Sequence, residues 1–513
     1  MQLPTFFTKP RLKLLLLLLT LLLATPGVLK QTWIRGDGHE YLLMTHAIYR
    51  HGSPLIRSSD IEELKGLPQE QLQSAHLPVD LLELVRKHYE TYQPKLYGGF
   101  AATAPERFYA IHFWFYSLLA APFYAVTTAL GLNPAWAFAL LNLAFVVAVF
   151  LFLRRSLPQH AYVALALFVM LGGSYYMSWT GPEVMTASFA LMSTVALLGG
   201  ELGFAVLLAG LGATQNPSLI FMIPFACGFR TLIWKWPGLA WPGRVVGRVG
   251  AREFSLVAAG VALALLPYAF FQSVFGVPSL ISQSFNHPQL ITWNRYFSLW
   301  FDLDQGMLIG VPGLFAALLV VPLLFAWEDR RRWLLLAAGV FLMVTCMAVP
   351  TLSAVNWNAG CTVMLRYAYW LAMPLLALML LGFERMRMDA LRRVFLTVLV
   401  LQGATFVEYG VQGEHSNSVA HSVPVRWILR NFPASYNPDP EIFYERSIGA
   451  EKTMLPTLTY LYKQDGEALK LLRQQNNLQP TGEYCPPGQR LVGQKVRMVD
   501  GGWQYEHAPF HCQ

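Results

Sequence analysis

Runs of about twenty apolar residues recur along most of this sequence, and a helix of that length crosses the hydrocarbon core of a bilayer. The 513 residues are 55% hydrophobic and only 13% charged, which is more apolar surface than a soluble fold buries. The sequence therefore predicts an all-α polytopic membrane protein. The expected fold is a bundle of about eleven transmembrane helices with juxtamembrane helices at the outer face and a small C-terminal periplasmic domain.

The expected spans follow one another with short loops. The first lies within residues 1–29, and a long polar segment separates it from the rest. The other ten lie near residues 134–153, 161–178, 184–200, 201–213, 216–230, 254–272, 306–326, 333–350, 366–383 and 394–411. The predicted organisation is a first transmembrane helix (1–29), a first periplasmic loop with juxtamembrane helices (30–133), a transmembrane bundle (134–412) and a periplasmic C-terminal domain (413–513).

Basic residues set the expected orientation. They precede the first apolar run and recur at Arg154-Arg155, at Arg330-Arg331-Arg332 and between Arg385 and Arg393. Lys and Arg in short loops stay on the cytoplasmic side, so the N-terminus is expected inside and the C-terminus outside. This pattern also accounts for the net charge of +8. Because the basic residues are not interleaved with aromatic residues on one face, no nucleic-acid partner is expected.

Two alternatives stay open in this topology. The first apolar run also fits the hydrophobic region of a cleavable signal peptide, although an uncleaved anchor is favoured. The stretch Phe108–Gly131 is apolar enough to span but rich in aromatic residues, so it is interpreted as lying in the outer leaflet. If it spans, every later basic loop inverts.

The chain becomes polar from about residue 413. Asn437-Pro438-Asp439-Pro440 is typical of a turn, and residues 454–475 are predicted to be helical. Cys485 and Cys512 are the two cysteines of this tail, and a disulfide between them is expected in an oxidising compartment. Two free thiols are the alternative.

Motifs of soluble enzymes are missing, since the sequence has no GxSxG, GxxxxGK[ST] or HExxH pattern. It also shows no Cys/His or carboxylate spacing that predicts metal ligands. Function must then come from polar residues that the outer loops hold against the membrane. The first loop places Asp37 shortly after the first span. The simplest interpretation of a single carboxylate there is a solvated interfacial charge.

Four segments, in this order along the chain, resemble the membrane-embedded C-type glycosyltransferases. The resemblance covers about residues 12–410 and is greatest to the bacterial group that uses polyprenyl-phosphate sugars, which includes relatives of the lipid A aminoarabinose transferase and the protein O-mannosyltransferases. The segments are GDGHEYLLMTHAIYRHGSP (36–54), ERFYAIHFWFYSLLAAPFYA (106–125), LWFDLDQGMLIGVPGL (299–314) and NAGCTVMLRYAYWLAMP (358–374).

The resemblance implies transfer of a monosaccharide, with inversion, from a polyprenyl-phosphate donor to a cell-envelope glycan, lipid or protein. The implied location is the bacterial inner membrane, with chemistry at its periplasmic face and membrane lipids as neighbours. The family's first-loop aspartate matches Asp37, which implies a catalytic base for the acceptor hydroxyl. This sequence has Gly38-His39 next, where the family has an acidic or small residue, so a share of that role for Glu40 stays open.

The resemblance also implies contacts to donor and acceptor. An arginine at the outer end of a late span matches the position of Arg366 and implies a donor-phosphate contact, with a snorkelling arginine as the alternative. Packing and helix-dipole roles are the corresponding alternatives for His112 and Glu183. The substrate-binding candidates are Arg366, Glu183, Arg107, His112, Tyr41 and Asp302.

Other functions stay open beside this one. An O-antigen-ligase type of transferase would carry its long periplasmic loop late in the chain, whereas here the long loop comes first. A transporter would show charges within its spans and a two-fold repeat, and neither is visible. A non-catalytic assembly partner is a further alternative. No cofactor is predicted with certainty, and participation of a divalent cation at the donor phosphate is left open.

The expected topology is testable with reporter fusions. A reporter fused after Gly413 is expected to be exported, and one fused after Arg155 is expected to stay cytoplasmic, because basic loops are retained inside. Export of the Arg155 fusion would show that Phe108–Gly131 spans the bilayer and that the orientation assigned to the later spans is wrong.

Overall fold

The fold is known from a computed structural model. It describes residues 9–29, 34, 37–66, 96–97, 99–236, 250–358, 364–407, 419–450, 452, 454–479, 481 and 484–513. The chain forms two compact units. The first unit comprises residues 1–285, 316–348 and 369–399, and the second comprises residues 286–315, 349–368 and 400–513.

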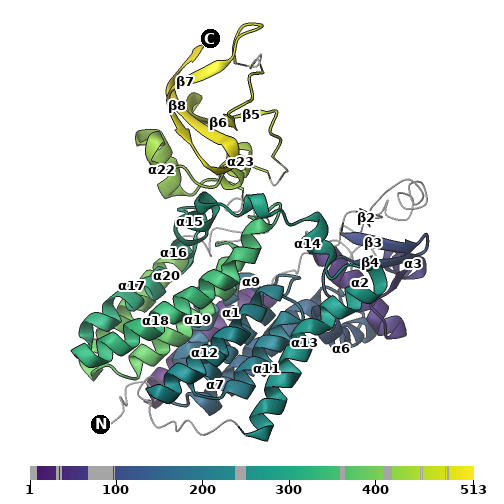
Figure 1. Cartoon of the computed structure of the whole chain (residues 1–513), viewed down its shortest axis with the longest axis vertical. Helices are drawn as coiled ribbons and strands as arrows, with labels where there is room; N and C mark the ends of the chain where they lie inside the picture. Colours follow the sequence, from purple (N-terminus) through teal and green to yellow (C-terminus); the bar gives the residue numbers. More distant parts are fainter. Residues whose placement is uncertain are drawn as a thin grey trace. The chain divides into compact units, whose positions relative to one another are not determined.

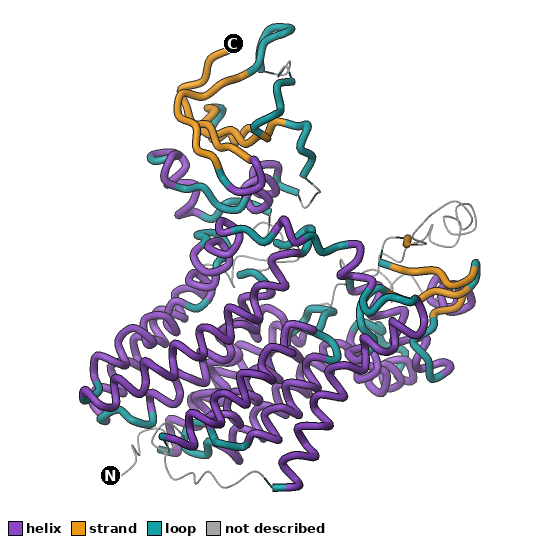
Figure 2. Tube along the Cα trace, in the orientation of Figure 1, coloured by secondary structure: helices purple, strands orange, loops and turns teal. Residues whose placement is uncertain are grey.

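Most of the described residues are helical, as Figures 1 and 2 show. The α-helices are α1 (Pro10–Leu29), α2 (Gly38–His51), α3 (Ser58–Lys65), α6 (Phe115–Ala129), α7 (Trp136–Ser156), α8 (Ala161–Phe168), α9 (Ser174–Tyr176), α10 (Glu183–Leu198), α11 (Leu202–Ala213), α12 (Met222–Lys235), α13 (Ala251–Phe275), α14 (Leu280–Ser284), α15 (Trp293–Phe301), α16 (Met307–Gly310), α17 (Pro312–Val320), α18 (Trp327–Ala348), α19 (Arg366–Phe383), α20 (Met388–Thr405), α22 (Val423–Asn431) and α23 (Pro440–Ile448).

Four of the described helical stretches are long and apolar enough to cross a membrane. They are Trp136–Ser156, Ala251–Phe275, Trp327–Ser353 and Arg366–Phe383. The expectation of about eleven transmembrane helices is therefore not supported. Several predicted spans are shorter helices, such as α11, whose 12 residues are about 18 Å long.

Backbone breaks explain why other apolar runs fall short of a full span. The run 161–178 is interrupted by a π-helical segment, Val169–Gly173, in which Gly172 has a φ of 143°. The run 306–326 is divided into α16, α17 and a short 3-10 turn, with a proline starting α17 and another at Pro322. Hydropathy predicts where a run is apolar but not where its helix stops.

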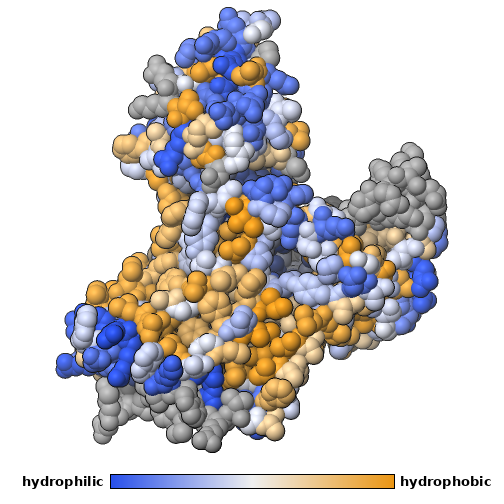
Figure 3. All heavy atoms as spheres, in the orientation of Figure 1, coloured by the Kyte–Doolittle hydropathy of each residue, from blue (hydrophilic) through white to orange (hydrophobic). Residues whose placement is uncertain are grey.

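The long helix α13 shows how the first unit packs. Phe254, Leu265 and Leu266 are exposed along it, and Figure 3 shows hydrophobic side chains over this part of the molecule. On its packed side, a Cβ at Gly260 would overlap the backbone of Val206 in α11, and one at Gly210 would overlap Gly260. Glycine at both positions lets the two helix backbones approach closely, as small residues do in membrane helices.

The all-α expectation is wrong, because the chain also folds into two antiparallel four-stranded sheets. The first loop contributes the order β1-β4-β3-β2, and the tail contributes β5-β6-β8-β7. The strands are β1 (Ile56–Arg57), β2 (Leu96–Tyr97), β3 (Phe100–Ala104), β4 (Arg107–Ala110), β5 (Thr459–Gln464), β6 (Glu467–Gln474), β7 (Leu491–Met498) and β8 (Trp503–Cys512).

The helix predicted near 454–475 is instead the β5–β6 hairpin. Asp465 and Gly466 join its strands with φ values of 52° and 83°, which is the backbone of a two-residue hairpin turn. Tyr460 and Tyr462 alternate inward along β5 and join the core of the tail. Strand β6 is rich in leucine and has helical propensity, but the Asp-Gly turn and the burial of alternate tyrosines determine the fold.

The structure joins Cys485 to Cys512, whose Cα atoms lie 5.7 Å apart. Cys512 ends β8 and is paired in register with Leu491, at the start of β7. The bond closes a loop over the sheet edge, with a sequence separation of 27.

Opening this loop should destabilise the tail domain. Cys485→Ser is expected to lower its free energy of unfolding by about 2–4 kcal/mol, because the unfolded tail regains loop entropy. Peptide mapping of unreduced protein should show one linked pair, with Cys227 and Cys346 alkylated as an internal control. Free alkylation of Cys485 and Cys512 in that sample would contradict the disulfide.

Candidate functional site

The first loop places two carboxylates at the start of one helix. Asp37 precedes α2, and the backbone N–H of Glu40 donates to the Asp37 carbonyl at 3.1 Å. The spacing of three residues puts both side chains on the same side of the first turn.

A β-hairpin brings a histidine to these carboxylates. Strands β3 and β4 pair Phe100 with Ala110, and the N–H of Ile111 then donates to the Gly99 carbonyl at 2.9 Å. His112 follows directly, so the end of the hairpin determines its position.

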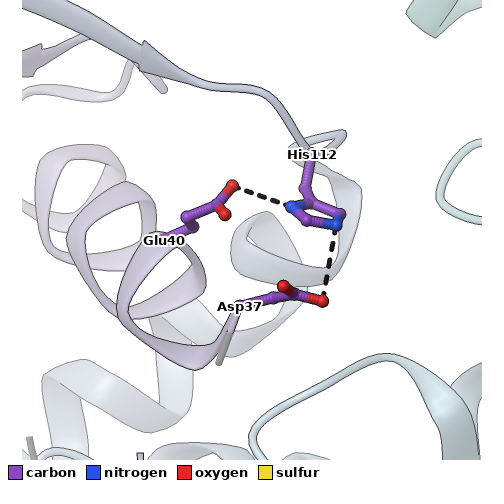
Figure 4. A group of neighbouring side chains, drawn as sticks. All are labelled: Asp37, Glu40 and His112. Carbon is purple, nitrogen blue, oxygen red and sulfur yellow. Dashed lines mark hydrogen bonds and ion pairs between the residues drawn. The ribbon is translucent and has the colours of Figure 1, made fainter. Parts of the chain in front are cut away.

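The imidazole of His112 lies between the two carboxylates (Figure 4). Its Nδ1 is 2.7 Å from Glu40 Oε2, a hydrogen-bond distance, and its Nε2 is 3.5 Å from Asp37 Oδ2. We call Asp37, Glu40 and His112 the first-loop cluster.

Exposure separates the roles of the two acids. The Glu40 side chain is 3% exposed, whereas Asp37 is 35% exposed. Burial raises the pKa of Glu40, the His112 ring partly opposes this, and the charge of Asp37 adds to the rise. Glu40 therefore acts as the buried partner that orients the imidazole, and Asp37 presents its carboxylate to solvent.

The surroundings of the cluster hold it in place. A Cβ at Gly99 would overlap the Glu40 carboxylate, and one at Gly38 would overlap Thr180 Oγ1. Tyr41 is buried and packs its ring 5.5 Å from that of His112. The structure thus gives Tyr41 a packing contact with the histidine.

Two other sequence candidates lie outside the cluster. Arg107 is exposed at the start of β4, where its backbone pairs with Arg57. Glu183 is buried as the first residue of α10, after Pro182. Its turn lies near the cluster, because Thr180 packs against Gly38 at the start of α2.

Arg366 and Asp302 belong to the second unit. Arg366 is half-buried as the first residue of α19, and its Nη2 donates to the Tyr367 hydroxyl at 3.3 Å. Asp302 is 4% exposed, and its Oδ1 accepts from the N–H groups of Asp304 and Gln305 at 2.8 and 2.9 Å. These bonds order the loop that carries Asp302.

The first-loop cluster also supplies metal-ligand chemistry that sequence spacing did not predict. Each of its residues offers one ligand atom, and these atoms lie within 4.8 Å of one another. An imidazole with two carboxylates suits Zn²⁺ or Mn²⁺. The acidic pair is visible in the sequence as an i, i+3 pattern, but the histidine lies 72 residues beyond Glu40, so only the fold reveals the set.

No protein-family model, curated protein or solved structure matches this chain.

A methyl group tests how tightly the cluster is held. Gly99→Ala should displace the Glu40 carboxylate and lower stability by about 1–3 kcal/mol, the usual cost of overpacking. Gly228→Ala is the matched control, because a Cβ there meets nothing within 4 Å and alanine favours the helix. Thermal unfolding in detergent compares the two variants, and equal melting temperatures would contradict the tight contact.

Proposed function

We propose that this chain is a membrane glycosyltransferase that moves a monosaccharide from a polyprenyl-phosphate donor to a cell-envelope acceptor. The observation that carries the proposal is the first-loop cluster, in which the partly exposed carboxylate of Asp37 lies beside an imidazole that the buried carboxylate of Glu40 orients. The resemblance of the four segments to C-type glycosyltransferases supports the same assignment, since these segments contain Asp37, Glu40, His112 and Arg366.

The proposed reaction is a direct displacement. The acceptor hydroxyl oxygen forms a bond to the anomeric carbon as the bond from that carbon to the phosphate oxygen breaks. The electron pair of the broken bond leaves with the polyprenyl phosphate, and the configuration inverts. Asp37 takes the hydroxyl proton as the nucleophile attacks.

The other two cluster residues support Asp37 in this proposal. Glu40 accepts from Nδ1 of His112, which leaves Nε2 facing Asp37 at 3.5 Å. A carboxylate–imidazole pair of this kind determines the tautomer and the orientation of the ring. When the ring is protonated on both nitrogens, Nε2–H faces Asp37 and the ion pair limits the positions that the Asp37 carboxylate adopts.

Arg366 is the proposed donor-phosphate ligand. It begins α19, a helix with no acidic residue in its first turn, so the guanidinium adds to the positive end of the helix dipole. The helix N-terminus and the guanidinium of Arg366 both favour binding of an anion. A guanidinium binds phosphate oxygens by charge-assisted hydrogen bonds. The leaving phosphate gains negative charge, which such a group stabilises.

The proposed setting is a bacterial inner membrane, with the N-terminus cytoplasmic and the C-terminal domain periplasmic. The four apolar helical stretches support a membrane location. The disulfide of the tail supports an oxidising compartment for that domain.

Two substitutions separate proton transfer from donor binding. Asp37→Asn should lower kcat by about 10²- to 10⁴-fold, because the amide keeps the shape but does not accept the proton. Arg366→Ala should mainly raise the KM for the donor, because a ground-state phosphate contact contributes to binding. Sugar transfer from a purified polyprenyl-phosphate donor, in nanodiscs, measures both.

Circular dichroism of each variant provides the control for folding. Wild-type turnover by folded Asp37→Asn would rule out Asp37 as the base and favour Glu40 or a non-catalytic partner role. Export of lipid-linked sugar without transfer would favour a transporter.

A cation-assisted form of the same reaction is the second candidate, and the ligand atoms of the first-loop cluster favour it. The 3.5 Å between Asp37 Oδ2 and His112 Nε2 is long for a hydrogen bond, and two ligands about 2.1 Å from a shared ion lie at such a separation. If an ion takes part, EDTA abolishes transfer and Mn²⁺ restores it. Full activity in EDTA would exclude this form.

A further inference from the structure

In the second unit, one buried arginine bonds both to the start of α23 and to the segment that precedes Arg366 in the sequence. In the second unit, Arg295 of α15 is 5% exposed and donates from Nη1 to the carbonyls of Leu352 and Ala354, at 2.9 and 2.8 Å. The same guanidinium donates to Glu441 Oε2 at 2.8 Å and lies 3.4 Å from Asp439 Oδ2. One side chain therefore joins the segment 349–358 to the start of α23.

Asn358 donates two more hydrogen bonds to the same helix. Its backbone N–H donates to Glu441 Oε1 at 3.1 Å, and its side-chain Nδ2 donates to Glu445 Oε2 at 2.8 Å. We call Arg295, Asn358, Glu441 and Glu445 the α23 clamp. All four are buried, so the clamp fixes both the backbone and the side chain of Asn358.

The chain is also fixed directly before Arg366. The N–H of Leu365 donates to the Gln305 carbonyl at 2.8 Å, and the loop that carries Gln305 is ordered by Asp302. The tail domain holds this loop through Asp304, which accepts from His421 at 2.8 Å and lies 3.3 Å from Arg446 Nε. Residues of α23 and its neighbours thus anchor the chain at Asn358 and at Leu365.

Burying a charged side chain costs free energy unless a partner in a defined geometry compensates for the lost hydration. The buried charges of this network therefore require specific positions of their partners. An apolar contact would join the same segments with less constraint on their positions. A network of paired charges instead specifies one arrangement of the backbone.

We propose that the α23 clamp positions Arg366 for the donor phosphate, so that the tail domain completes the phosphate site. Arg295, Asn358 and Glu441 are positioning residues that act through Arg366. This inference rests on the proposed function for the role of Arg366.

The test measures coupling between the clamp and Arg366. Glu441→Gln removes the charge that faces Arg295, and Asn358→Ala removes the bond to Glu445. Each should weaken binding of polyprenyl phosphate in nanodiscs by about 3- to 30-fold when Arg366 is present, and by less than about twofold in an Arg366→Ala background. Asp465→Asn is the control, because it breaks the Arg430–Asp465 pair, whose side chains are 59% and 67% exposed, and should change nothing.

Hydrogen exchange gives a readout that needs no activity. Amides within 349–358 and 364–366 should exchange faster in both clamp variants and not in Asp465→Asn. If Glu441→Gln does not fold, the milder Asn358→Ala decides. Equal weakening in both Arg366 backgrounds, or unchanged exchange in both variants, would overturn the inference. If the wild type binds polyprenyl phosphate with this coupling but transfers no sugar, the proposed function fails and the positioning role stands.

Discussion

The hydrogen bond between Glu40 and His112 is the contact on which the first loop depends. A carboxylate buried to 3% exposure needs a partner that compensates for lost water, and the imidazole 2.7 Å away provides it. The bond requires that two elements place their side chains next to each other. The first turn of α2 positions Glu40, and the end of the β3–β4 hairpin positions His112. The small sheet of the first loop thereby positions a side chain that the helical bundle alone does not supply.

Among the described residues, the first-loop cluster and the charged network of the second unit differ in their exposure to solvent. In the second unit, Asp302, Asp304 and Arg295 are each 5% exposed or less. Burial and the charge of Asp304 raise the pKa of Asp302, whereas His421 and Arg446 outweigh the burial of Asp304 and lower its pKa. Such a network stabilises an arrangement of the chain. The first-loop cluster instead exposes 35% of Asp37 and 21% of His112, so solvent reaches both side chains.

The positions of the apolar helices are predictable from the sequence, but their lengths are not. The runs 134–153 and 366–383 correspond to candidate spans because no backbone break interrupts their helices. Gly172 and Pro312 interrupt other runs, and a hydropathy average over many residues does not detect such single-residue breaks. The Asp465-Gly466 turn is a hairpin signal in the sequence, and it identifies the β5–β6 hairpin where the leucine-rich pattern favours a helix. Asp37 and Glu40 were accessible to prediction as neighbours on one helix turn. Their meeting with His112 joins residues 72 positions apart and depends on the packing of the β3–β4 hairpin beside α2, which local patterns do not encode.

The different environments of Asp37 and Glu40 explain the different roles proposed for them. Glu40 loses hydration in the interior, so its pKa is raised above the usual 4.5, and it takes up a proton at a pH where a solvated glutamate stays ionised. Once protonated, it no longer offers His112 a charged acceptor, and the hydrogen bond that orients the ring becomes a weaker, neutral one. A base that must be ionised and must reach a substrate hydroxyl is better placed at Asp37, which retains water and faces outward. In the proposed reaction, acidity would act on the cluster through Glu40, by replacing a charge-assisted hydrogen bond to His112 with a weaker neutral one.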